Sequence, residues 1–278
     1  MNQTPDLPRR HRRVEVADVL RGFAVTAIVL LHSIEHFNFY SFPDTAGQST
    51  WLTFTDKAIW DGLFFLFGGK AYAIFALLFG FSFFIQHDNQ RMRGRDFRIR
   101  FCWRLLLLFA IGNLNACFFT AEILVMYSLV GFVLVATCRM PSKWVAALAA
   151  ICIMQPLCLY QIARALSDPS YTIPVIESGP YWRACFAQQT AGDFISTVRV
   201  NLVEGQLASL AWAWEHGRIF QTAGLFMAGM LIGRQGWFGP GHLRRWGAAF
   251  AWALACFFPL RGLLAMTGEF IDNPSVLT

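Results

Sequence analysis

The stretch DVLRGFAVTAIVLLHSIEHF, residues 18–37, decides the fold of this chain because it is mostly apolar and still carries charge. Its length matches the roughly 20 residues that a helix needs to cross the hydrocarbon core of a bilayer. Its ionisable side chains are Asp18, Arg21, His32, Glu35 and His36. On an ideal helix they fall within about a third of the circumference. Charges in a membrane span normally face a protein interior or a water-filled cavity, so we expect a transmembrane helix with one polar stripe.

The rest of the chain has the same apolar character. Of its 278 residues, 56% are hydrophobic and only 14% are charged, whereas a soluble domain carries about 25% charged residues. The apolar runs predict an all-α polytopic transmembrane helical bundle of about seven spans. We expect residues 57–66 to form a separate interfacial helix before the second span. The expected spans are residues 18–38, 64–86, 101–118, 122–138, 144–164, 218–235 and 246–266.

Basic residues are concentrated in alternate connections between these spans, at residues 9–13, 91–104, 139–143 and 234–245. Lys and Arg accumulate in the cytoplasmic loops of membrane proteins, so this distribution predicts a cytoplasmic N-terminus. The net charge of +6 is therefore read as a topology signal, and no nucleic-acid partner is expected. The expected location is the bacterial cytoplasmic (inner) membrane, with lipid as a partner and exposed apolar helices that suit a homodimer.

The chain divides into four parts in this interpretation. Residues 1–17 form a basic cytoplasmic segment, and residues 18–164 hold the first five spans. Residues 165–217 form an outer-face loop, in which an amphipathic stretch can lie on the membrane as an interfacial helix. Residues 218–278 hold the last two spans, and the chain is expected to stop short of the complete bundle.

The polar stripe of the first span combines two kinds of chemistry. Arg21 and His32 are eleven residues apart, which is about 16 Å along a helix. Arg21 can therefore bind an anion near the cytoplasmic surface while His32 acts as an acid or base deeper in the membrane. Glu35 lies one turn after His32, where it can orient the imidazole ring.

Several segments resemble a known family in order along the chain. They are LRGFA (20–24), GKAYAIFALLFGFSF (69–83), RFCWRLLLLFAIGNLNA (100–116), EILVMYSLVG (122–131) and RIFQTAGLFMAGMLIGRQGWF (218–238). These segments resemble the DUF418 (YeiB-like) family of bacterial inner-membrane proteins. The first span also resembles the acyltransferase-3 family, which has an arginine and a histidine separated by ten residues, as Arg21 and His32 are. The resemblance implies a polytopic helical fold related to transmembrane acyltransferases.

These observations lead to the hypothesis of a membrane acyltransferase. The donor is acyl-CoA as a co-substrate, with no bound cofactor, and its phosphates are expected at Arg21, Arg100 and Arg104. His32 and Glu35 are the catalytic residues, and the acceptor is a hydroxyl of a glycan or lipid head group at the outer face. The other substrate-binding residues in this hypothesis are Lys70, Glu122 and Arg218. Lys70 and Glu122 can instead neutralise one another, and Arg218 can pair with Glu122.

Two other classes of function stay open from the sequence. The segment HSIEH, residues 32–36, fits an H-x-x-E-H zinc pattern, in which His32 and His36 bind the metal and Glu35 is the base. The acyltransferase hypothesis assigns no metal. Intramembrane Arg, His, Glu and Lys residues also suit a proton-coupled transporter or exporter.

Overall fold

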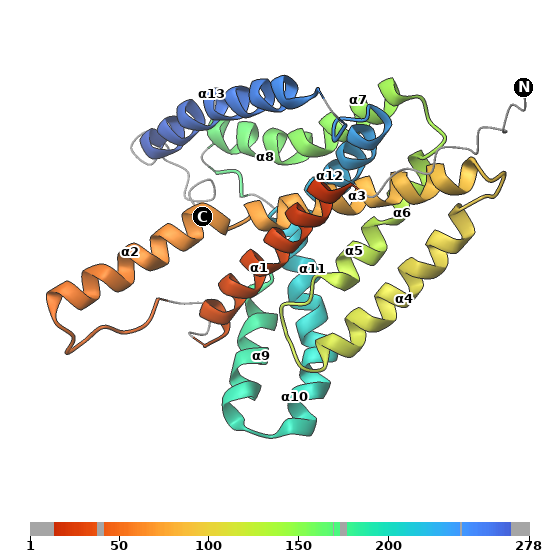
Figure 1. The fold of residues 1–278 in the computed structure, drawn as a ribbon. Helices are drawn as coiled ribbons and strands as arrows, with labels where there is room; N and C mark the ends of the chain where they lie inside the picture. The colour runs from red at the N-terminus through yellow and green to blue at the C-terminus, as the bar shows by residue number, and fades with distance from the viewer. Residues whose placement is uncertain (1–13, 38–41, 169, 173–176, 240, 268–278) are drawn as a thin grey trace, which may run out of the picture.

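The computed structural model describes residues 14–37, 42–168, 170–172, 177–239 and 241–267. Within these ranges the chain forms helices and no strands (Figure 1). Four helical stretches are long and apolar enough to cross a membrane: Glu15–Glu35, Thr50–Arg91, Arg98–Ala116 and Ser142–Ser167. This composition indicates a membrane protein. The basic segment expected at residues 1–17 lies almost entirely outside the described residues.

Helix α1 (Glu15–Phe37) packs against the central helix α3 (Lys70–Arg91). Its buried face consists of three alanines and a leucine, Ala17, Ala24, Ala27 and Leu31. These side chains recur at helical spacing, and their small size lets the two helices approach closely. The expectation of a long helix over residues 18–38 is confirmed.

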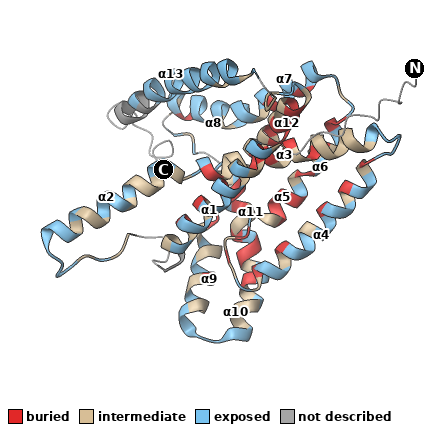
Figure 2. Ribbon diagram, in the orientation of Figure 1, coloured by how far each residue is buried: buried red, intermediate tan, exposed pale blue. Residues whose placement is uncertain are grey.

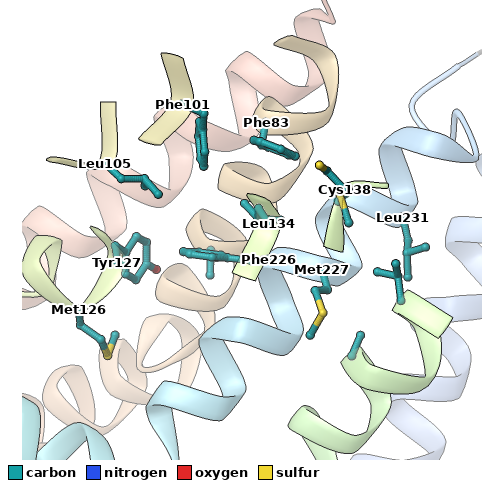
Figure 3. Packing of buried hydrophobic residues seen from close by; sticks show 14 of the residues in the cluster. Phe83, Phe101, Leu105, Met126, Tyr127, Leu134, Cys138, Phe226, Met227 and Leu231 are labelled. Carbon is teal, nitrogen blue, oxygen red and sulfur yellow. The ribbon is translucent and has the colours of Figure 1, made fainter. Parts of the chain in front are cut away.

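Helix α12 (Arg218–Arg234) packs against α3 in the most extensive helix pair among the described residues. A Cβ atom added at Gly80 of α3 would collide with the backbone carbonyl of Phe226, and one at Gly229 would collide with that of Leu77. Small residues are the usual means of close helix packing in membranes. Figure 3 shows the side chains around this helix pair, with Phe83 of α3 and Phe226 of α12 buried in one cluster.

The rest of this cluster comes from the helices between α3 and α12. Helix α4 (Arg98–Ala116) forms an antiparallel hairpin with α5 (Leu124–Val130), followed by α6 (Phe132–Thr137). The short connection at residues 117–123 makes this hairpin tight. The fourth expected span, 122–138, is a shorter helical stretch, Leu124–Thr137, and Gly131 between α5 and α6 keeps helical dihedral angles.

Two other expected spans are interrupted. The second span, 64–86, is divided between α2 (Thr50–Phe67) and α3 by Gly68 and Gly69, and Gly69 has a φ of 68°. The expected interfacial helix at 57–66 is thus the second half of a longer helix. The fifth span is divided into α7 (Ser142–Met154) and α8 (Pro156–Ser167) at Gln155, which has a φ of 48°. A residue before proline is disfavoured in a helix, which explains this break.

The expected outer-face loop at 165–217 is largely helical. It contains α9 (Gly179–Ala191), α10 (Phe194–Val200), a π-helical segment (Asn201–Gly205) and α11 (Gln206–Glu215). Helices α9 and α10 form a hairpin that projects from one end of the molecule (Figure 1), and the π-helical segment contacts α4. This part is therefore packed protein structure and not a loop with one surface helix.

The last helix, α13 (Leu243–Thr267), covers the seventh expected span. Its described side chains are largely exposed, as the blue ribbon in Figure 2 shows. Exposed apolar side chains such as Phe250 and Trp252 suit a helix that faces lipid.

Candidate functional site

Arg21 is held between α1 and α3 by two hydrogen bonds. It donates to the carboxylate of Asp18 at 2.8 Å and to the hydroxyl of Ser82 at 2.7 Å. The Ser82 hydroxyl itself donates to the carbonyl of Leu78 at 2.7 Å. The guanidinium is therefore fixed at a defined place on the contact between the two helices.

Beside Arg21 lies a groove of about 260 Å³ between α1, α3 and α4. Arg104 also lines this groove, so two guanidinium groups face a largely apolar space. Side chains of α3 and α4 form its walls, among them Phe75, Leu78, Phe79, Phe101, Leu105 and Leu108. Such a combination of apolar walls and a few charged groups is typical of ligand sites.

A second cavity, of about 810 Å³, adjoins this groove, since Gln86 and Arg104 line both. These two side chains are hydrogen-bonded to each other. Arg93 and Arg100 add positive charge to the larger cavity, and Trp103 lines it with a side chain that is 62% exposed. The structure thus places Arg21, Arg100 and Arg104, three of the residues predicted to bind substrate, along two adjoining cavities.

The pairing of the neighbouring charges leaves Arg93 and Arg100 available. Asp96 binds Arg98 at 2.7 Å and Arg139 at 3.3 Å. The hydrogen bonds from Arg98 hold the pKa of Asp96 well below its usual range. Among the described side chains, no ion pair engages the guanidinium of Arg93 or Arg100. The lining of the larger cavity therefore carries two guanidinium groups that no described carboxylate pairs with.

His32 and Glu35 form a pair further along α1. The Nδ1 atom of His32 lies 3.0 Å from Oε2 of Glu35, and Phe119 packs edge-on against the imidazole with 5.4 Å between ring centroids. The side chains are 42% and 22% exposed. Neither residue lines the two cavities, and the pair lies about 16 Å along the helix from Arg21. The contact that the sequence predicts is present, while the catalytic role stays a prediction.

Lys70 and Glu122 do not neutralise one another. Lys70 donates to the carbonyl of Phe65 and lies over its ring, so it caps the exposed end of α2. Glu122 is buried, and its carboxylate accepts hydrogen bonds from Asn115 and from the backbone N–H of Leu124. Glu122 thus links α4 to the start of α5. The suggestion that Lys70 and Glu122 form an ion pair is therefore wrong.

Arg218 does not pair with Glu122 either. Its guanidinium lies between two aromatic rings, 5.1 Å from the ring of Tyr72 and 5.5 Å from that of Trp212. It also donates to Gln221 at 3.0 Å. The residue joins α3, α11 and α12 next to Gly69, at the break before α3.

The zinc hypothesis gains no support from the described residues, among which no three His, Cys, Asp or Glu side chains are grouped as metal ligands. The side chain of His36 lies outside the described part, so its pairing with His32 is not tested.

A polar cluster around the π-helical segment is not predicted from the sequence. Asn201 and Gln206 are buried there. The α4–α5 loop packs against the segment, since Asn201 donates to the carbonyl of Cys117 and Thr120 lies next to Gly205. π-Helical turns occur frequently at functional sites. The amides Asn201 and Gln206 lie within an otherwise apolar stretch of the sequence, and this pattern could have indicated the segment.

The fold and these cavities define an all-helical protein with membrane-helix character and a groove lined by two guanidinium groups. No protein-family model matches the chain, and no solved structure matches it. It is similar to the uncharacterised protein YxaH of Bacillus subtilis, with 32% identity over 135 residues, 45% of this chain and 32% of YxaH. It is also similar to an uncharacterised 39.9 kDa protein of the amylase 3′ region in Bacillus acidopullulyticus, with 28% identity over 44% of this chain and 33% of that protein. The match thus spans about a third of the length of each relative.

Proposed function

We propose that this protein is a membrane-embedded acyltransferase that moves an acyl group from acyl-CoA to a hydroxyl of a glycan or lipid head group. The observation that carries the proposal is the pair of adjoining cavities, where Arg21 and Arg104 line the apolar groove and Arg93 and Arg100 line the larger cavity. An acyl thioester with a phosphorylated carrier needs both kinds of surface. Guanidinium groups bind phosphate through charge-assisted hydrogen bonds, and apolar walls accept the acyl chain.

The larger cavity also suits the nucleotide part of such a donor. The exposed indole of Trp103 lies among Arg93, Arg100 and Arg104. Aromatic side chains stack on nucleobases, and each stack contributes about 1–3 kcal/mol. The base would lie on Trp103 while the phosphates contact the guanidinium groups, and the acyl arm would extend into the groove beside Arg21.

The His32–Glu35 pair supplies the acid–base chemistry in this proposal. Glu35 accepts the Nδ1–H of His32 and leaves Nε2 free to take the proton of the acceptor hydroxyl. The hydroxyl oxygen attacks the thioester carbonyl, the C–S bond breaks, and the proton returns from His32 to the leaving thiolate. An ester and a free thiol are the products, so no other reactant is needed.

The proposal includes the topology inferred from charge. The N-terminus is cytoplasmic, the chain crosses the bacterial cytoplasmic membrane about seven times, and the larger, arginine-lined cavity faces the cytoplasm, where acyl-CoA is found. Lipid and a second copy of the chain are the partners that the exposed apolar helices favour.

Turnover of radiolabelled acetyl-CoA by the protein in lipid nanodiscs tests the proposal. We expect thioester turnover that is lost in His32→Ala and retained in His242→Ala, a control in the connection before α13. The zinc content of each sample is measured in parallel. Equal turnover in wild type and His32→Ala would refute the catalytic assignment, and zinc that is lost on substitution would favour the metal site.

A second candidate function, proton-coupled transport, is favoured by the interrupted helices. Apolar runs broken at Gly68–Gly69 and at Gln155 resemble the discontinuous spans that form substrate sites in transporters. Gly69 contacts Arg218, and Gln155 contacts the neighbouring Gly217, so the two breaks lie close together. Substrate-dependent proton flux without a covalent product would favour this function.

A further inference from the structure

The α4–α5 loop, residues 117–123, connects the His32–Glu35 pair to the π-helical segment. On one side, Phe119 of this loop packs on the ring of His32. On the other side, Asn201 donates to the carbonyl of Cys117 at 3.4 Å, and Ser209 donates to the carbonyl of Thr120 at 3.1 Å. The pair and the π-helical segment therefore flank one short loop.

Two buried amide side chains at this place have polar atoms without a protein partner. Asn201 is 3% exposed and its Oδ1 atom accepts no hydrogen bond, while Gln206 is 9% exposed and neither Nε2 nor Oε1 is bonded. The π-helical turn, which is itself frequent at functional sites, ends directly before Gln206. Buried polar groups are nearly always bonded, so each exception calls for an explanation.

The surrounding polar side chains, in contrast, are satisfied within the protein. Gln189 of α9 donates to the hydroxyl of Thr120 at 2.8 Å. Glu122 accepts from Asn115 and from a backbone N–H. At this place the unused capacity lies on the amides of Asn201 and Gln206, and it amounts to an NH₂ donor group and two carbonyl acceptors.

This combination favours a neutral, hydroxyl-rich ligand. Each hydroxyl both donates and accepts a hydrogen bond, so a sugar or glycerol head group can use the NH₂ group and both oxygens. An anion would leave the two carbonyl oxygens unused, and a cation would leave the NH₂ group unused.

We propose that Asn201 and Gln206 bind the hydroxyl-rich head group of the acyl acceptor, on the far side of the α4–α5 loop from His32. The role of the bound molecule as acyl acceptor rests on the proposed function, whereas the binding site itself rests on the buried amides alone. In this arrangement the acceptor reaches His32 from the end of the molecule where the α9–α10 hairpin projects, while the donor enters between α3 and α4 (Figure 1).

The test measures binding without any acyl donor. Wild-type protein in phosphatidylcholine nanodiscs is mixed with monoglucosyl diacylglycerol in one arm and with a soluble maltooligosaccharide in the other. The sugar retained per chain after re-isolation is measured by mass spectrometry. We expect retention in at least one arm, and a loss of about tenfold in Gln206→Leu and in Asn201→Leu. The control, Asn113→Leu, removes an amide that bonds to its own helix at the carbonyl of Phe109 and should bind normally.

Thermal unfolding of the same samples separates binding from folding. Gln206→Leu should unfold at or above the temperature of wild type, because it replaces an unbonded buried amide by an apolar side chain. Equal sugar retention in Gln206→Leu and wild type, or no retention in either arm, would overturn the inference. Amide-dependent sugar binding without acyl transfer would support the binding site and refute the proposed function. Acyl transfer that does not depend on the amides would support the proposed function and refute the binding site.

Discussion

Replacing Glu35 by Gln tests how the carboxylate acts on His32. The change keeps the size and the hydrogen-bonding oxygen but removes the negative charge 3.0 Å from Nδ1. In the resting protein the pair contributes little, about 0.5 kcal/mol, because both side chains are partly exposed. In the transition state of the proposed reaction His32 carries the proton of the acceptor, so the lost charge would act on a full imidazolium.

The size of the effect follows from the distance and the exposure. Two unit charges about 4 Å apart at an effective dielectric constant of about 20 attract by about 4 kcal/mol. His32 is 42% exposed, so solvent screening reduces this by about half, to about 2 kcal/mol. That energy corresponds to a fall in kcat of about 30-fold with little change in KM.

The assay is steady-state acetyl transfer from acetyl-CoA in nanodiscs, with kcat and KM determined separately. The control is Glu15→Gln, which removes an exposed charge at the start of the same helix and should leave both constants unchanged. A fall in kcat of less than about threefold, or an effect on KM alone, would refute the idea that Glu35 stabilises a protonated His32.

Three further predictions concern the donor cavity and the fold. Arg104→Leu should raise the KM for acetyl-CoA about 10-fold or more, because it removes a charge-assisted phosphate contact, and an unchanged KM would place the donor elsewhere. Gly80→Ala should lower the free energy of unfolding by about 1–3 kcal/mol, since its Cβ collides with a carbonyl of α12; Gly62→Ala, with open space around it, is the control in the same thermal-unfolding experiment. Asp96 has a lowered pKa through Arg98, so its stabilising contribution is complete above the pKa of the unfolded state and is lost as the pH falls toward the folded value. The Tm difference between wild type and Asp96→Asn should therefore shrink on acidification, and a difference that grows would contradict this assignment.

The sequence was sufficient for features that follow from local patterns. The apolar length of residues 18–37 predicts α1, and the recurrence of small residues such as Ala24 and Ala27 explains which face is buried. The break at Gln155 was readable from Pro156, and the break before α3 from the pair of glycines, although we expected continuous spans there. Hydrophobic periodicity alone does not detect such breaks, because the residues on both sides are equally apolar.

Features that depend on contacts between distant segments could not be predicted in the same way. Lys70 and Glu122 have opposite charges, but each meets a closer partner: the carbonyl of Phe65 for Lys70, and Asn115 for Glu122. The π-helical segment has no strong local signal, since one extra residue in a turn changes neither composition nor hydrophobicity. The burial of Gln206 depends on the helices that pack around it.

The central claim is that an acyl group passes from a cytoplasmic donor to a hydroxyl acceptor through the site on α1. Sealed membrane vesicles of known orientation test it directly, with radiolabelled acetyl-CoA supplied on the side of Arg100 and ester-linked label measured on the opposite side. The account predicts labelled ester with wild-type protein and none with His32→Ala. Label that is absent with both proteins, or equal in the two, would contradict it.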